Sequence, residues 1–179
     1  MTPRAVLSFW FEEIAPARWW SVDPAFDASL RDRFGELLAQ AAAGECQPWR
    51  TEAPGRLAEV IVLDQFSRNI HRGTPAAFAQ DPMALALAQE AVAAGALAEL
   101  SAIERNFLLM PYMHSESRRV HAWAEALYRE HAPPDNLDFE LRHKAIIDRF
   151  GRYPHRNAIL GRASTPEETA FLAQPGSSF

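Results

Sequence analysis

Apolar residues recur every three or four positions along most of this chain, and helix start and stop signals separate the periodic segments. The segment 24–43 begins after Asp23, ends before Gly44 and carries five apolar residues at this spacing: Phe26, Leu30, Phe34, Leu37 and Leu38. Such a spacing places apolar side chains on one face of a helix, and glycine commonly ends a helix. A second segment, 55–71, is apolar almost all round, which predicts a helix at the centre of the fold.

Capping residues and prolines open six further segments, at 3–11, 81–95, 101–110, 115–131, 135–150 and from Thr165 onward. Ser115 and Asp135 are the N-caps that the pattern favours, and Pro111 is expected to stop or kink its helix. No run of alternating apolar and polar residues between turn residues predicts a strand. The sequence therefore predicts an all-α protein of about eight antiparallel helices.

The length of 179 residues predicts a single domain over 1–179, with residues 174–179 as a frayed tail. Helix pairs of this length favour a stack like that of tetratricopeptide repeats. The tetratricopeptide consensus residues, however, do not recur at a fixed period, so the repeat signal is one of geometry alone.

Composition and missing motifs narrow the function. The formal net charge is -5 and the pI is about 5.7, which argues against nucleic-acid binding because that usually needs a basic surface. No apolar run approaches the ~18 residues of a membrane span and no export signal is visible, so we expect a cytoplasmic location without membrane contact. A single cysteine, Cys46, and the lack of glycine-rich, nucleotide-binding and metal-binding motifs predict neither a cofactor nor a metal.

The most informative stretch is basic in a chain that is acidic overall. Six Lys or Arg residues and one acid, Asp148, lie between Arg142 and Arg162. Their neighbours include Phe150 and Tyr153, which favour burial, and a guanidinium drawn into a partly buried place needs anionic or carbonyl partners. The stretch therefore predicts either an anion-binding loop or a loop whose arginines anchor to helix ends and acids of the protein itself.

Two other polar clusters interrupt apolar surroundings. On the predicted central helix, Asp64, Arg68 and Arg72 recur at intervals of four residues and so share one face. His114 and Glu116 flank the expected junction of two helices, where backbone N–H groups lack helical partners. Ionised groups in such places need partners across the fold, so we expect these clusters to converge with the basic stretch.

The three clusters together predict a polar site. His114 and His155 are the candidate acid–base catalysts, and arginines would stabilise negative charge. The candidate ligand-binding residues are Asp64, Arg68, Asn69, Arg72, Glu116, Arg149, Arg152, Arg156 and Asn157. Arginine forks match carboxylate and phosphate groups, so the expected ligand is a small anion.

Four segments of the chain resemble a bacterial family, Domain of Unknown Function 924: 6–11 (VLSFWF), 63–72 (LDQFSRNIHR), 111–116 (PYMHSE) and 149–162 (RFGRYPHRNAILGR). They follow one another in the family's order from end to end, and Ser67 stands where the family pattern has proline. The resemblance implies an all-α, tetratricopeptide-like fold. Because the family name carries no established activity, the resemblance leaves the function open.

Two functions therefore remain open from the sequence. The first is a cytoplasmic protein that binds a small anionic molecule in a pocket lined by Arg, His and Asp, either as an enzyme or as a binding protein. The second is a tetratricopeptide-like module that binds a peptide, for example one with an acidic terminus, along a concave face. A closed pocket favours the first function and an open groove favours the second.

Overall fold

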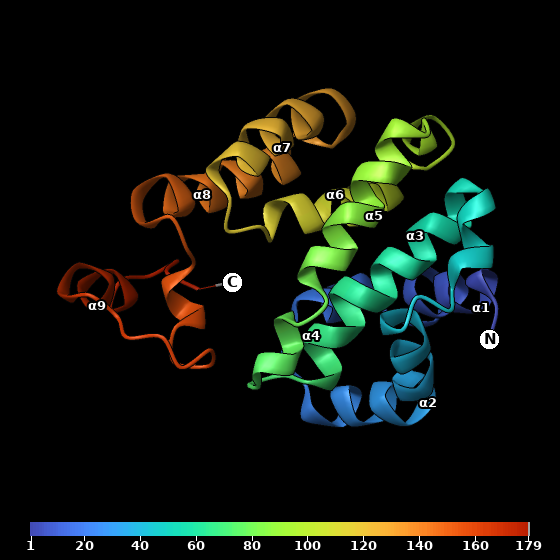
Figure 1. Cartoon of the computed structure of the whole chain (residues 1–179), viewed down its shortest axis with the longest axis horizontal. Helices are drawn as coiled ribbons and strands as arrows, with labels where there is room; N and C mark the ends of the chain where they lie inside the picture. The colour runs from blue at the N-terminus through green and yellow to red at the C-terminus, as the bar shows by residue number, and fades with distance from the viewer. Residues whose placement is uncertain (179) are drawn as a thin grey trace.

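Helices make up the regular structure of the protein (Figure 1). In the computed structural model, which describes residues 1–178, the α-helices are α1 (Pro3–Ser8), α2 (Pro24–Ala42), α3 (Ala53–Ile61), α4 (Ser67–Ile70), α5 (Asp81–Ala93), α6 (Ala102–Met113), α7 (Arg118–His131), α8 (Pro134–Phe150) and α9 (Pro166–Leu172). Residues 1–178 contain no strand, so the predicted all-α fold is confirmed. Within the same residues, no helix is both long and apolar enough to cross a membrane.

Two of these helices continue through π-helical turns. α1 runs into a π turn at Phe9–Glu13, and α3 and α4 are joined by a π turn at Val62–Phe66. Residues 53–70 thus form one continuous rod, which confirms the central helix predicted over 55–71 apart from its ends. Hydrogen bonds in a π turn reach one residue further than in an α-helix, so the side chains that follow are rotated around the axis.

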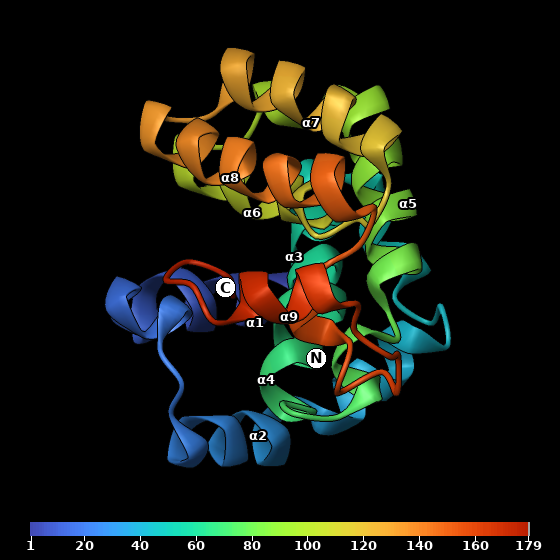
Figure 2. The ribbon, with the colours of Figure 1, turned by 90° about the vertical axis from the view of Figure 1, so that its left-hand side faces the viewer.

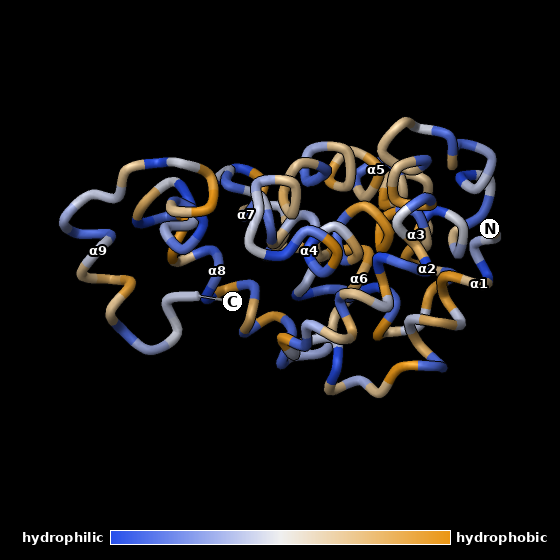
Figure 3. The backbone as a smooth tube through the Cα atoms, turned by 90° about the horizontal axis from the view of Figure 1, so that it is seen from below, coloured by the Kyte–Doolittle hydropathy of each residue, from blue (hydrophilic) through white to orange (hydrophobic). Residues whose placement is uncertain are grey.

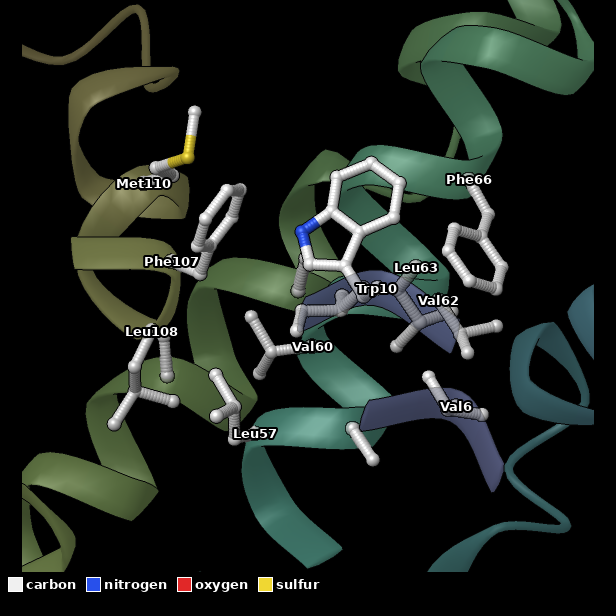
Figure 4. Packing of buried hydrophobic residues seen from close by; sticks show 14 of the residues in the cluster. Val6, Trp10, Leu57, Val60, Val62, Leu63, Phe66, Phe107, Leu108 and Met110 are labelled. Atoms are coloured by element: carbon white, nitrogen blue, oxygen red, sulfur yellow. The ribbon is translucent and has the colours of Figure 1, made fainter. Parts of the chain in front are cut away.

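The rod lies inside the main hydrophobic core (Figure 4). Its side chains Leu57 and Leu63 are fully buried. The Trp10 ring, on the first π turn, lies 5.5 Å from the Phe66 ring and 5.7 Å from the Phe107 ring, measured between centroids. Aromatic side chains bury large areas and often meet edge to face, so these contacts tie the N-terminal turn, the rod and α6 together.

The later helices stack on this core in chain order. α5 and α6 pack against α3, α7 packs against α6, and α8 packs against α7. Figure 2 shows α7 and α8 side by side above the rest of the molecule. Consecutive helices joined by short loops are expected to run antiparallel, and this is the arrangement of α6, α7 and α8.

The end of α8 and the residues after it form a small second hydrophobic cluster. Ile146, Ile147 and Tyr153 are buried in it, with Phe150 and Phe171 packed against them. Figures 1 and 3 show that α9 projects at one end of the molecule, away from α1 to α3. The C-terminal segment, residues 151–178, therefore meets the main body at a junction between two apolar clusters. Phe179, at the end of the expected tail, lies outside the described residues, and the single domain stays a prediction.

Two predicted helix boundaries near proline are wrong for local reasons. Of the two outcomes expected at Pro111, a stop or a kink, the stop does not occur: α6 continues to Met113, because only the last turn follows and the missing N–H removes a single helical hydrogen bond. α8 begins at Pro134, with Asp135 in its first turn rather than at the cap. Proline is favoured at the first helical position because its N–H would have no partner there.

The predicted N-cap of α7 is also displaced. Ser117 holds that position, and its side chain accepts a hydrogen bond from the N–H of Val120. Ser115 instead accepts a hydrogen bond from the N–H of Ser117, inside the preceding turn. The turn between α6 and α7 is therefore ordered by Ser115 and Ser117, on either side of Glu116, and it holds His114 and Glu116 at fixed positions on the junction.

Candidate functional site

A buried carboxylate on the central π turn organises the candidate site. Asp64 is 1% exposed; its Oδ1 lies 3.1 Å from Arg68 Nη1 and 2.8 Å from His114 Nδ1. Its Oδ2 accepts a hydrogen bond of 2.6 Å from Gln65 Nε2. Burial alone would raise the pKa of Asp64, but the charge of Arg68 and the hydrogen bonds from His114 and Gln65 outweigh it and hold that pKa below its usual value. The carboxylate is therefore ionised, on a type of turn that is frequent at functional sites.

His114, the C-cap residue of α6, is a neutral base held by that carboxylate. An ionised carboxylate can only accept hydrogen bonds, so the ring proton of His114 resides on Nδ1, where it bonds Asp64. Burial, followed by the charge of Arg68, lowers the pKa of His114 and keeps the ring neutral at pH 7. Nε2 therefore carries the lone pair, and the side chain is 12% exposed. A carboxylate that orients a neutral imidazole is the arrangement of a general base.

Asp81 joins two arginines that are far apart in the sequence. It is the first residue of α5 and accepts two hydrogen bonds from Arg68, at 2.8 and 3.0 Å. Its Oδ2 also accepts one from Arg156 Nη1, at 3.2 Å. These contacts place Asp64, Arg68, His114 and Arg156 in one network, as the sequence led us to expect.

Arg156 is buried with most of its hydrogen-bonding capacity unused. Its side chain is 7% exposed, yet its guanidinium makes one hydrogen bond to residues 1–178, the bond to Asp81, and its buried Nε has no partner among them. The guanidinium stacks on two rings, with Cζ 4.6 Å from the centroids of Phe78 and Tyr153. Burial, followed by the charge of Arg68, lowers the pKa of Arg156. A guanidinium has five N–H donors, so this one is short of acceptors.

The second candidate histidine, His155, lies beside Arg156 on the short 3-10 turn Pro154–Arg156. Its ring centroid is 5.5 Å from that of Tyr153. Burial, followed by the charge of Arg156, lowers the pKa of His155 to about 4. A ring with so low a pKa is a weak base at pH 7, so His114 is the better placed of the two candidate catalysts.

A second polar network fastens the C-terminal segment to the junction of α6 and α7. Glu116 accepts hydrogen bonds from Arg162 at 2.6 and 2.9 Å and from the N–H of Tyr153 at 2.7 Å. Arg162 Nε donates to Asn157 Oδ1 at 2.9 Å, and the Asn157 amide donates to Glu168 at 3.3 Å. Each of these polar side chains has a partner within the protein. Glu116 and Asn157 therefore help to hold the C-terminal segment on the main body.

Two of the candidate ligand-binding arginines form ion pairs with the start of α9. Arg152 makes two hydrogen bonds to Glu168, at 2.6 and 2.8 Å. Arg149 makes two to Glu167, at 2.8 and 3.0 Å, where the side chains are 49% and 65% exposed. Acids of α9 thus occupy the forks of both arginines, which do not join the network of Arg156 and Asp81.

Arg72 and Asn69 lie on another side of the rod. Arg72 makes two hydrogen bonds to Asp27 of α2, at 2.6 and 3.0 Å, and Asn69 makes one at 2.9 Å. The expected shared face of Arg72 and Asp64 does not form, because α4 ends at Ile70 and Arg72 follows the end of the helix. This pair of candidates therefore ties the rod to α2 and, within residues 1–178, makes no side-chain hydrogen bond to the His114 network.

Tyr153, which stacks on Arg156, is anchored by a completely buried pair. His121 and Glu140 are both 0% exposed and are joined by a hydrogen bond of 2.7 Å. His121 Nε2 lies 2.8 Å from the carbonyl oxygen of Ser115, which can only accept, so Nε2 carries a proton. The Tyr153 hydroxyl lies 3.2 Å from the same Nε2. The ring beneath Arg156 is thus fixed from α7 and α8.

Sequence reasoning missed Asp81, Gln65 and Tyr153 as parts of the site. Asp81 precedes Pro82, and an acid at such a place is fully explained by the start of a helix. Gln65 follows Asp64 and Tyr153 follows Arg152, and an uncharged side chain beside such a neighbour gave no separate signal of a role in the site. Only the spatial neighbours of Asp64, Arg68 and Arg156 identify the three residues.

Two surface depressions lie away from this network. One, of about 500 Å³, is lined by Gln89, Tyr112, Trp123, Ala126 and Leu127. The other, of about 300 Å³, lies between α2 and the end of the rod and includes Arg31, Leu38, Ser67 and His71 in its lining. Neither depression is lined by Asp64, His114 or Arg156. At the candidate site the Arg68 and Asp81 side chains are each 18% exposed. Residues 1–178 hold no cluster of three or more His, Cys, Asp or Glu suited to a metal.

The comparisons with known proteins agree with this architecture. Residues 6–176 match the model of a family described as bacterial protein of unknown function, DUF924. The chain belongs to this family. A solved structure of a protein of unknown function from Agrobacterium tumefaciens is 36% identical, with a TM-score of 0.90 over 96% of each chain. The comparison with curated proteins gives no match. The family resemblance read from the four segments is confirmed.

Proposed function

We propose that the protein binds a small anion between Arg156 and the Asp64–His114 pair, and that it is an enzyme in which His114 is the general base. One observation carries the proposal: Arg156 is 6% exposed, yet its guanidinium makes a single hydrogen bond to residues 1–178. A buried donor left without an acceptor costs about 1–3 kcal/mol, and more when the group is charged. An anion at Arg156 supplies the missing acceptors.

The Asp64–His114 pair suits a reaction on the bound molecule. Asp64 fixes the Nδ1–H of His114, so Nε2 can take a proton from the substrate or from a water molecule, and the carboxylate then stabilises the imidazolium. Arg68 and Arg156 are the nearby groups that would stabilise negative charge as it develops. A well-placed general base typically contributes about 10²–10⁴-fold to a rate.

A thermal-shift screen tests the binding step. The wild type, Arg156→Ala and Arg149→Ala are heated with a panel of phosphorylated and carboxylated compounds. Arg149 is the matched control, because it lies in the same basic stretch but is 49% exposed and paired with Glu167. We expect at least one compound to raise the Tm of the wild type and of Arg149→Ala by the same amount and to leave the Tm of Arg156→Ala unchanged.

The same variants test the opposite interpretation, in which Arg156 is an internal anchor. As a ligand-binding residue, Arg156 can be removed with little loss of stability in the free protein, because few of its donors are satisfied. As an anchor for Asp81, its removal would destabilise the free protein by about 1–3 kcal/mol, which lowers Tm by several degrees. That loss, together with no stabilising compound for the wild type, would refute the proposed function.

A second candidate function rests on the depression at Trp123. This side chain is 45% exposed, and the Arg119 guanidinium lies 5.2 Å from its ring centroid. An apolar hollow beside a cation suits a peptide that pairs an apolar residue with an acidic one. If such peptides bind there, they should quench the Trp123 fluorescence. The Trp123→Ala variant should lose peptide binding and should still be stabilised by the anions that bind at Arg156. Absence of quenching by acidic peptides removes this candidate.

A further inference from the structure

The charged groups of the candidate site balance each other. Arg68 and Arg156 are paired through Asp81, and Arg68 also contacts Asp64, so two positive and two negative charges meet. His114 adds no charge at pH 7, because burial lowers its pKa. A phosphate monoester brings a charge near -2 at this pH and would leave the partly buried site with a large negative excess. A group with one negative charge leaves the smaller excess.

The charge that faces a ligand is that of a single guanidinium. Asp81 binds Arg68 through two hydrogen bonds of 2.8 and 3.0 Å, whereas its contact with Arg156 is single and longer, at 3.2 Å. Arg68 is therefore already matched by a carboxylate, and Arg156 is the arginine whose charge is least compensated. One guanidinium matches one carboxylate in both charge and shape.

The surroundings of Arg156 favour a flat ligand group. Phe78 and Tyr153 lie against the guanidinium, each with its centroid 4.6 Å from Cζ, and Nη1 is occupied by Asp81. The edge formed by Nε and Nη2 makes no hydrogen bond to residues 1–178. A carboxylate can lie in the plane of this edge and accept two parallel hydrogen bonds. A tetrahedral phosphate would direct oxygens out of that plane, toward the apolar rings.

We propose that the anion recognised by Arg156 is a carboxylate, and hence that the substrate is a small carboxylic acid rather than a phosphorylated compound. This inference rests on the anion-binding function proposed above and narrows it to one chemical class. The two carboxylate oxygens accept from Nε and Nη2 of Arg156, while Asp81 stays on Arg68. The rest of the molecule would then extend toward His114, whose side chain is 12% exposed.

The test compares anions of the two classes on the full chain. The wild type is titrated at pH 7.5 with acetate, propionate or inorganic phosphate, with sodium chloride adjusted to hold the ionic strength constant. We expect acetate and propionate to raise Tm by several degrees at a concentration about one hundred times Kd, and phosphate to leave Tm unchanged.

Two matched variants show whether the effect belongs to Arg156. Arg156→Lys keeps the charge but loses the planar fork, so carboxylate binding should weaken by about tenfold or more. Arg149→Lys makes the same chemical change at an arginine that is paired with Glu167, and its carboxylate binding should equal that of the wild type. If Arg156→Lys does not fold, the wild type decides: one arginine Nε–H resonance in its ¹⁵N–¹H spectrum should shift on addition of acetate.

Each contrary result points to a different error. Stabilisation by phosphate that needs Arg156, with none by carboxylates, overturns the carboxylate class and leaves the anion-binding function intact. A carboxylate effect that persists unchanged in Arg156→Lys overturns the assignment to this fork. No effect of any anion on Tm, together with no shifted arginine resonance, overturns both this inference and the function on which it rests.

Discussion

Replacement of Asp64 by asparagine tests the electrostatic organisation of the site most directly. The carboxylate is 1% exposed and contacts Arg68, His114 and Gln65 at 3.1, 2.8 and 2.6 Å. Asparagine has almost the same shape but no charge, and its amide group can accept through one oxygen only. Asp64→Asn therefore removes the charge that faces Arg68 while it leaves the packing of the rod almost unchanged.

The expected loss follows from the burial of the partners. Removal of one member of a buried ion pair costs about 3–5 kcal/mol, because the other charge is left without compensation. Arg68 keeps its two hydrogen bonds to Asp81, so we expect a loss near the lower end, about 3 kcal/mol. For a chain of 179 residues, this lowers Tm by about 6–12 °C. The pKa of His114 should fall further, because the charge of Asp64 is the largest of the effects that raise this pKa in the wild type.

Thermal unfolding and the NMR titration of the His114 ring measure the two effects. Glu125→Gln is the control, because Glu125 pairs with Arg129 at 2.7 Å on the surface of α7, where the arginine is 65% exposed. An exposed pair at this spacing contributes about 0.3–0.5 kcal/mol, so Tm should change by no more than about 2 °C. The reasoning would be refuted if Asp64→Asn had the same Tm as Glu125→Gln, or if the pKa of His114 rose in Asp64→Asn.

Two further predictions concern packing and pH. In Gly55→Ala the new Cβ would lie 1.9 Å from the carbonyl oxygen of Trp49, so the backbone must move, and we expect a loss of about 1–3 kcal/mol or more. In Gly35→Ala the nearest atom is 3.9 Å away, and helix propensity should stabilise the protein by up to about 1 kcal/mol; equal Tm values for these variants would contradict the argument. Burial lowers the pKa of His143 to about 3 and that of His155 to about 4, so the unfolded chain takes up protons first as the pH falls below about 6.5. Stability that is present above pH 6.5 should then be lost toward pH 4 by up to about 1.4 kcal/mol per pH unit for each histidine, and urea unfolding with the same free energy at pH 7 and pH 5 would contradict this.

The helices were predictable from sequence wherever local chemistry decides their ends. The capping box at the start of α9 is formed as expected, with the N–H of Glu168 bonded to Thr165 Oγ1 and the N–H of Thr165 bonded to the Glu168 carboxylate. Gly151 ends α8 with a φ of 70°, a left-handed conformation that glycine adopts readily. The π turns were not predicted, because the apolar residues Val62, Leu63 and Phe66 suit an α-helix equally well.

The sequence was a better guide to which residues belong to the candidate site than to which acid each arginine contacts. The sequence shows that buried charges such as Arg68 and Arg156 need partners, but it does not show which acid each one meets. Asp81, Asp27 and Glu168 are all available in the chain, and the packing of the helices decides among them. A difference of one residue at the end of a helix, as at Ile70, is enough to move the next arginine to another acid.

The contrast between Arg162 and Arg156 bears most directly on function. Both come from the C-terminal segment and both reach acids of the main body, yet all three guanidinium nitrogens of Arg162 donate hydrogen bonds, to Glu116, Asn157 and the carbonyl of Tyr153. Arg162 is thus sufficient to fasten the segment. Arg156 is more deeply buried and, within residues 1–178, makes one hydrogen bond, of 3.2 Å, beside its contacts with the Phe78 and Tyr153 rings, so attachment by hydrogen bonds does not account for its position. The ligand that we propose for this site, which would complete those hydrogen bonds, does account for it.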